Sequence, residues 1–132
     1  MRNSLHHVHA FASDVNASVR FYTEVFGGEV ILDEVLAGAR NVFIRIGDGR
    51  LHLYDQPPRH SGAGSIHHFG IRTDDISHMV ERLQRHGVQL RKQVTELVGW
   101  RYVMVPAPDG VLIELFEVTP EKLPAQLADY AT

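Results

Sequence analysis

Three histidines fall within four positions near the start of the chain, in the stretch LHHVHA. An imidazole can bind a metal ion, move a proton or lie on a solvated surface. Apolar and polar side chains alternate over residues 5–12, which indicates a β-strand. Alternate strand side chains share one face, so His7 and His9 are expected on the face opposite His6. This alternation is more typical of a folded element than of a tag remnant.

Comparable residues recur in the second half of the chain. His68 lies 61 positions after His7, in the similar stretch IHHFGI. The stretches RLHLYD and LIELFE place His52 and Glu114 at matching positions of two further strands, 62 residues apart. Three imidazoles and a carboxylate suit Fe(II), Ni(II), Co(II), Mn(II) or Zn(II). We therefore predict one divalent metal ion bound by His7, His52, His68 and Glu114. The remaining histidines are interpreted as surface or structural residues: His6, His9, His60, His67, His78 and His86.

The elements that must position these residues occur twice in the same order. In the first half, a helix is predicted to begin after Asp14 and to end at Gly27, because aspartate favours the N-cap and glycine the left-handed C-terminal turn. In the second half, Asp75 and Gly87 take these places, and Asp75 lies 61 positions after Asp14. The predicted strands are residues 5–12, 29–36, 41–46 and 50–55, then the stretch SIHHFGIRTDD, 89–95, 100–105 and 111–118.

These elements predict an α+β fold of two tandem βαβββ modules, residues 4–56 and 65–118, within a single domain over residues 1–132. A Pro-, Gly- and Ser-rich linker, DQPPRHSGAGS, joins the modules, and residues 119–132 form a C-terminal tail without an assigned function. Each module has too few strands to bury both sheet faces, so a helix should cover one face. We expect the other faces to form a curved mixed sheet with a metal-binding cup.

Composition limits the partners and the cellular location. The 132 residues carry a formal net charge of −3, which does not favour nucleic acid or an acidic membrane surface. No apolar run is long enough to span a membrane, and the N-terminus does not resemble a signal peptide. The absence of cysteine excludes disulfides, thiolate nucleophiles and cysteine-ligated zinc. We expect a soluble cytoplasmic protein with a small-molecule partner.

Several side chains of the predicted cup could contact a substrate. Arg72 shares the face of His68 and could bind an anionic group, although a surface or salt-bridged arginine is an equal alternative. The large side chains of GWRYVMV could line the pocket, although such residues more often belong to a core. His9 could orient His7 or a bound water. The candidates for substrate binding are Arg72, His9, Trp100, Tyr102 and Met104.

The sequence is similar to the vicinal oxygen chelate superfamily, which includes glyoxalases, fosfomycin-resistance proteins and extradiol dioxygenases. The similarity spans about residues 4–118 and rests on HVHAFASDVNASVRFYTEVFGGEV, its second-half equivalent HFGIRTDDISHMVERLQRHGV and the closing stretch PDGVLIELFE. It implies paired βαβββ modules, metal ligands at the same four positions and a homodimer with sites at the module interfaces. Histidine at position 52 departs from the glutamate of glyoxalase I and the glutamine of methylmalonyl-CoA epimerase.

The resemblance and the ligand set give three functional hypotheses. The first is a metal-dependent glyoxalase-like lyase or isomerase acting on a small oxygen-chelating substrate, with Glu114 as metal ligand and catalytic base. The second is a non-haem Fe(II) dioxygenase. The set of His7, His68 and Glu114 would suit it, although His52 would fill a coordination position that oxygen needs. The third is a non-catalytic drug- or metabolite-binding protein, which does not need four metal ligands.

Overall fold

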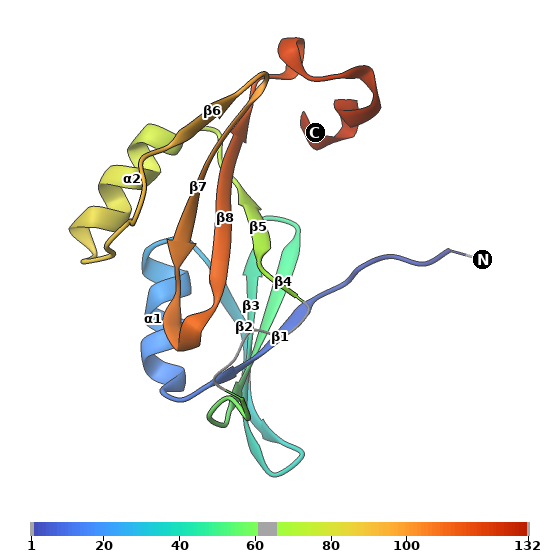
Figure 1. Cartoon of the computed structure of the whole chain (residues 1–132). Helices are drawn as coiled ribbons and strands as arrows, with labels where there is room; N and C mark the ends of the chain where they lie inside the picture. Colours follow the sequence, from blue (N-terminus) through green and yellow to red (C-terminus); the bar gives the residue numbers. More distant parts are fainter. Residues whose placement is uncertain (1, 61–65, 132) are drawn as a thin grey trace. The chain divides into compact units, whose positions relative to one another are not determined.

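Two compact units make up the chain, Met1–Gly62 and Ala63–Thr132 (Figure 1). The computed structural model describes residues 2–60 and 66–131. Within these residues, each unit contains one α-helix and a four-stranded mixed sheet. No helix in the described part of the chain is long and apolar enough to cross a membrane. The predicted linker, residues 55–65, lies partly outside the described residues.

The first unit runs in the order strand, helix and three strands. Its elements are β1 (Val8–Ala12), α1 (Val15–Glu24), β2 (Glu29–Leu36), β3 (Ala39–Ile46) and β4 (Gly49–Asp55). The strand order in the sheet is β1-β4-β3-β2, with β1 parallel to β4 and the other pairs antiparallel. Helix α1 contacts β2, β3 and β4.

The second unit repeats this order. Its elements are β5 (Phe69–Arg72), α2 (Ile76–Arg85), β6 (Thr95–Leu97), β7 (Trp100–Pro106) and β8 (Leu112–Val118). Short 3₁₀ helices are η1 (Pro108–Gly110), η2 (Pro120–Lys122) and η3 (Ala125–Ala131). The strand order is β5-β8-β7-β6, with β5 parallel to β8. The predicted α+β fold with two βαβββ modules is confirmed.

The first strand of each module starts later than predicted. The parallel ladders begin with the pairs Val8–Leu51 and Phe69–Ile113. His7 and His68 therefore lie on backbone just before β1 and β5 and not within those strands. A strand start depends on the partner strand, which local alternation does not reveal.

The strand predicted at residues 89–95 is wrong in its position. Strand β6 covers Thr95–Leu97. The preceding residues 91–93 are arginine, lysine and glutamine, a polar run without the alternation of a half-buried strand. Leu90 and Val94 line a cavity together with Val80 and Gln84 of α2, and the pairing with β7 begins only at Thr95.

Alternate strand residues pack against the helix of their own unit. The buried core residues include Val15, Tyr22, Val42, Ile44, Leu51 and Leu53 in the first unit and Ile76, Leu83, Val103, Val105, Ile113 and Leu115 in the second. Because strand side chains alternate, the residues between them point to the opposite side, which we call the helix-free face. This face includes His9, Phe11, Phe43, His52 and Tyr54 in the first unit. In the second unit it includes Gly70, Arg72, Trp100, Tyr102, Met104, Glu114 and Phe116.

Aspartate begins each helix and glycine follows its end, as predicted. The carboxylates of Asp14 and Asp75 each accept a hydrogen bond of 3.0 Å from the backbone N–H three residues later. After the helices, Gly27 and Gly87 have positive φ angles of 68° and 79°, which glycine adopts without a Cβ clash. Local sequence signals therefore determine both helix ends.

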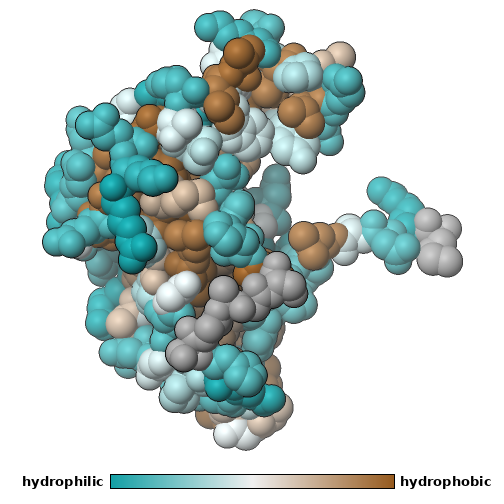
Figure 2. Space-filling model, viewed as in Figure 1, coloured by the Kyte–Doolittle hydropathy of each residue, from teal (hydrophilic) through white to brown (hydrophobic). Residues whose placement is uncertain are grey.

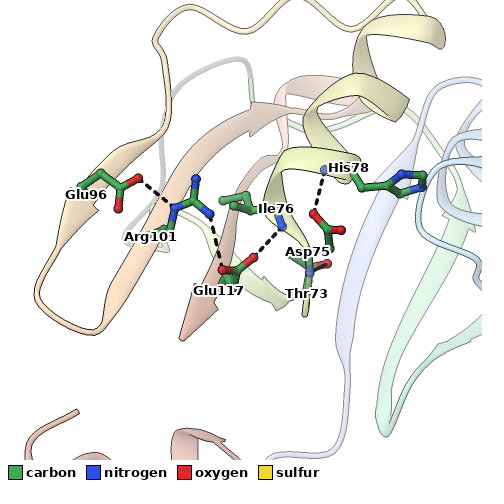
Figure 3. Close-up of polar contacts among 7 residues, drawn as sticks. All are labelled: Thr73, Asp75, Ile76, His78, Glu96, Arg101 and Glu117. Atoms are coloured by element: carbon green, nitrogen blue, oxygen red, sulfur yellow. Dashed lines mark hydrogen bonds and ion pairs between the residues drawn. The ribbon is translucent and has the colours of Figure 1, made fainter. Parts of the chain in front are cut away.

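A carboxylate from β8 supports the start of α2 (Figure 3). Glu117 accepts a hydrogen bond of 2.8 Å from the N–H of Ile76, the first residue of the helix. Its other oxygen lies 3.5 Å from the Arg101 guanidinium, which also donates a hydrogen bond of 2.9 Å to Glu96. The negative charge of Glu117 lies at the positive end of the helix dipole, so this contact stabilises α2 against its sheet.

Apolar side chains are exposed at equivalent places in the two modules. Val35 is 73% exposed and Leu36 is 40% exposed in β2. The residues 62 positions later are Leu97, which is 56% exposed, and Val98, which is 83% exposed. Figure 2 shows apolar surface at the top of the view, where β6 ends near the C-terminal segment.

Replacing Glu117 with alanine should destabilise the protein by about 1–2 kcal/mol, because the N–H of Ile76 loses a charged acceptor in a partly buried position. Urea denaturation followed by circular dichroism measures the free energy of unfolding. Glu96→Ala is the matched control, because Glu96 contacts the same arginine but its side chain is 67% exposed. That variant should lose about 0.5 kcal/mol or less. Equal losses in the two variants would contradict this role of Glu117.

Candidate functional site

The two predicted ligands of the first module belong to a stack of three rings. His52 lies in β4 on the helix-free face. The ring of His7 stacks on it with centroids 4.0 Å apart and planes at 17°. The ring of Phe43, the register partner of His52 in β3, stacks on it at 3.7 Å and 11°. Two rings this close and this parallel must lie on opposite faces of the imidazole, so His52 is held between them.

The two predicted ligands of the second module are a histidine and a carboxylate that face each other. Glu114 lies between the buried Ile113 and Leu115 of β8, which places its side chain on the helix-free face. The Nε2 atom of His68 lies 3.8 Å from Oε2 of Glu114, which is too long for a hydrogen bond. The side chains of His68 and Glu114 are 35% and 23% exposed, so a small ligand can reach both.

Three predicted substrate-binding residues of β7 lie on the same face as Glu114. Met104 is the register partner of Glu114, and Tyr102 is the partner of Phe116. Trp100 stacks on Phe116 with centroids 4.4 Å apart and planes at 5°. All three β7 side chains are half-buried, so they form a wall of mainly apolar surface beside the carboxylate.

The predicted anion contact, Arg72, binds the C-terminal segment. Its Nη1 atom donates a hydrogen bond of 3.0 Å to the carbonyl of Tyr130 in η3. The ring of Tyr130 lies 5.7 Å from the ring of Trp100. The C-terminal tail, residues 119–132, therefore contacts the helix-free face of its own unit at Arg72 and Trp100.

His9 lies among aromatic side chains of β1 and β4. Its ring centroid is 6.0 Å from that of Phe11 and 5.7 Å from that of Tyr54. The guanidinium of Arg59 lies 5.5 Å from the centre of the Phe11 ring, within the range of a cation–π contact. His9 is also the register partner of His52 in the parallel ladder, so both are on the helix-free face.

Two histidines interpreted as surface residues contact the predicted ligands. Nδ1 of His6 lies 3.0 Å from Nδ1 of His7, and Nδ1 of His67 lies 2.8 Å from Nδ1 of His68. The sequence carries a signal for this pairing, because the doubled histidine occurs at equivalent positions of both halves. A strand at these positions predicts no such contact, because strand alternation places neighbouring side chains on opposite faces.

Comparison with known families identifies the relationship of this chain. Residues 4–115 match the sequence model described as the Glyoxalase/Bleomycin resistance protein/Dioxygenase superfamily. The chain belongs to this superfamily. The match extends over both βαβββ modules to the middle of β8, and it confirms the family resemblance drawn from the sequence motifs.

Two proteins of similar sequence come from a bacterium and a plant. The protein YwbC of Bacillus subtilis, which is described as uncharacterized, is 28% identical over 89% of this chain and 99% of its own length. A probable chloroplastic lactoylglutathione lyase of Arabidopsis thaliana is 29% identical over 92% of this chain. The chain spans only 38% of the length of that lyase.

Solved structures of the superfamily share the fold. The fosfomycin resistance protein FosX of Listeria monocytogenes superposes with a TM-score of 0.78 and 19% identity, covering 92% of this chain and 96% of that protein. A structure of the same protein complexed with Mn(II) and a sulfate ion gives a TM-score of 0.71 and 20% identity, covering 92% and 98%. The superfamily fold therefore accommodates Mn(II) in that relative.

The donor atoms of His68 and Glu114 fit a divalent cation. Imidazole nitrogens and carboxylate oxygens are accepted by Mn(II), Zn(II) and related ions. The 3.8 Å between Nε2 of His68 and Oε2 of Glu114 can be spanned by two metal–ligand bonds of about 2.1 Å each. Among residues 2–60 and 66–131, no group of three or more histidine or acidic side chains is close enough to hold a metal ion.

The environment of His52 favours its neutral form. Burial lowers the pKa of its imidazole below the ordinary value, and the nearby His7, His9, His6 and Arg50 lower that pKa further. A neutral imidazole keeps a nitrogen lone pair that a cation can bind, whereas a protonated one does not. His52 is therefore suited to binding a metal ion in mildly acidic solution.

In the metal-free protein, the free energy of unfolding should fall as the pH is lowered from about 6.5, because the unfolded chain protonates His52 before the folded protein does. The contribution of His52 is complete above its unfolded pKa and is lost as the pH falls through the lower folded pKa. His52→Gln should weaken this dependence in urea denaturation at about pH 7.5 and about pH 5. The exposed His60→Gln serves as control. An unaltered pH dependence in His52→Gln would contradict a lowered pKa.

Proposed function

We propose that this protein is a metal-dependent glyoxalase-like lyase or isomerase that moves a proton on a small substrate with two neighbouring oxygens. The observation that carries the proposal is the pair His68 and Glu114 in the second module, whose Nε2 and Oε2 atoms lie 3.8 Å apart. The equivalent positions of the first module hold His7 and His52, whose rings stack. In both modules one donor precedes the first strand and the other lies in the last strand. The two pairs would together hold one divalent ion: Ni(II), Co(II), Zn(II), Mn(II) or Fe(II).

Two kinds of relative support this class of chemistry. The plant relatives are named as lactoylglutathione lyases, and they are 27–29% identical to this chain. The FosX relative is complexed with Mn(II) in its solved structure. The proposal takes the metal and the lyase chemistry from these relatives, and the residues from the donor set of this chain.

The side chains have separate tasks in the proposed reaction. His7, His52 and His68 would hold the cation as neutral imidazoles, and Glu114 would hold it as a carboxylate. The bound cation would polarise the substrate oxygens and make the neighbouring C–H bond more acidic. Glu114 would accept the proton as a general base, since it is the acidic member of the set.

The surroundings of Glu114 suit proton transfer. Its register partner Met104 and the stacked rings of Phe116 and Trp100 place mainly apolar surface on the same face of the sheet. Apolar surface limits the water that competes for a transferred proton. Arg72, which donates a hydrogen bond to the C-terminal segment, lies on the same face and would bind an anionic group of the substrate.

We also propose that the protein is a homodimer. The exposed apolar residues at the ends of β2 and β6 support it, because they repeat in both modules. A second copy would remove these side chains from water, which is favourable for association.

Mn(II) binding tests the proposed ligands. Calorimetric titration of metal-free protein should show one ion per pair of modules, and light scattering on the same sample should give the mass of a dimer. His68→Ala should weaken Mn(II) binding by about tenfold or more, because it removes one of the donors. His78→Ala, at an exposed histidine on α2, is the matched control. Unchanged affinity in His68→Ala would remove His68 from the site.

Glu114→Gln tests the proposed base. The change keeps the size and one oxygen donor but removes the basic charge, so proton transfer should slow by about 10² to 10⁴. The measurement is solvent deuterium exchange at the acidic carbon of a thiohemiacetal of a 2-oxoaldehyde, with metal content matched between the proteins. Mn(II) affinity should fall less than the exchange rate, which separates the loss of a base from the loss of a ligand.

Controls for this exchange experiment distinguish the alternative reactions. Glu121→Gln, at an exposed glutamate in η2, should exchange at the wild-type rate. Equal exchange rates in the wild type and in Glu114→Gln would show that Glu114 is not the catalytic base. No exchange in either protein, together with oxygen uptake on a catechol, would favour the dioxygenase hypothesis instead.

A further inference from the structure

The doubled histidines before β1 and β5 share one geometry in the two modules. The Nδ1 atoms of His6 and His7 are 3.0 Å apart, and the two rings meet edge to face at 88°. The Nδ1 atoms of His67 and His68 are 2.8 Å apart, and their rings meet at 82°. Each half of the repeat therefore forms the same contact.

The late start of both strands makes this contact possible. Within a strand, neighbouring side chains point to opposite faces, so two consecutive rings would be kept apart. Because β1 begins at Val8 and β5 at Phe69, both histidine pairs lie on the backbone just before a strand. Their rings can therefore turn toward each other.

A hydrogen bond between two Nδ1 atoms requires different tautomers in the two rings. One Nδ1 must carry the hydrogen, and the other must offer a lone pair. If His7 and His68 donate through Nδ1–H, their Nε2 atoms are unprotonated and can bind a cation. His6 and His67 are then the acceptors, and they carry their own hydrogen on Nε2.

The ring of His68 has the orientation that a cation bound between His68 and Glu114 would require. Nε2 is the atom of His68 that faces Glu114, at 3.8 Å from Oε2. The contact with His67 uses the other nitrogen of the same ring. In the first module, the stack on His52 fixes the plane of the His7 ring, and the contact with His6 fixes its rotation within that plane.

We propose that His6 and His67 are positioning residues, which hold His7 and His68 in the tautomer and orientation suited to metal binding. This inference rests on the proposed metal function and extends it to two residues outside the ligand set. Neither residue touches the metal or the substrate in this arrangement. Each accepts the Nδ1 hydrogen of its neighbour and so keeps the Nε2 lone pair available.

Nitrogen NMR of the metal-free protein tests the tautomers directly. At about pH 8.5, where ordinary imidazoles are neutral, it reports which ring nitrogen carries the hydrogen. We expect the hydrogen on Nδ1 in His7 and His68 and on Nε2 in His6 and His67. His6→Phe and His67→Phe keep a ring but remove the acceptor, so the neighbouring ring should shift toward the Nε2–H form. The reverse tautomers in the wild-type protein would overturn the proposal.

Calorimetric Mn(II) titration tests the consequence for metal binding. His6→Phe and His67→Phe should each weaken binding by about tenfold, the usual effect of removing a partner that orients a ligand. His6→Asn and His67→Asn keep an oxygen acceptor close to the position of Nδ1, so they should recover most of the affinity. His78→Phe, on the exposed side of α2, controls for the added phenyl ring. Equal losses in the phenylalanine and asparagine variants would overturn the proposal.

The two measurements separate this inference from the proposed function. A wild-type protein that binds no Mn(II) but has the expected tautomers would refute the metal function and support positioning of the rings by His6 and His67. A wild-type protein that binds Mn(II), with full affinity in both phenylalanine variants, would refute positioning and leave the metal function standing.

Discussion

Each sheet of this protein has one helix and therefore two unequal faces. Four strands can bury one face against a helix, and strand alternation then sends every second side chain to the other face. Leu51 and Leu53 pack toward α1, so His52 between them must point away from it. Ile113 and Leu115 impose the same direction on Glu114. The position of each strand donor is thus a consequence of how its core is packed.

The order of strands explains why residues distant in sequence become neighbours. The last strand of each module pairs in parallel with the first, so β4 lies beside β1 and β8 beside β5. A donor in the last strand is thereby brought next to a donor at the start of the first strand. His7 reaches His52 in this way, and His68 reaches Glu114. The same topology repeated twice therefore brings two such side chains together in each module.

The two pairs differ in charge, and they are therefore suited to different chemistry. The pair in the first module is two imidazoles, and burial together with nearby histidines and Arg50 lowers the pKa of His52. The pair in the second module contains a carboxylate beside half-buried aromatic and sulfur-containing side chains. A neutral imidazole can bind a cation, whereas a carboxylate can also accept a proton. The repeat therefore places two chemically different pairs of side chains at equivalent positions of one architecture.

The sequence by itself determined the features that depend on neighbouring residues. Helix periodicity, the caps Asp14 and Asp75 and the alternation of β4 and β8 are local, so the two modules and the faces of His52 and Glu114 could be predicted. Only the tertiary structure decided where β1 and β5 start, because a strand end depends on its pairing partner. It also decided the contacts between distant rings and the docking of Tyr130 on Arg72. Such contacts depend on where separate elements meet in space, which the local pattern of residues does not encode.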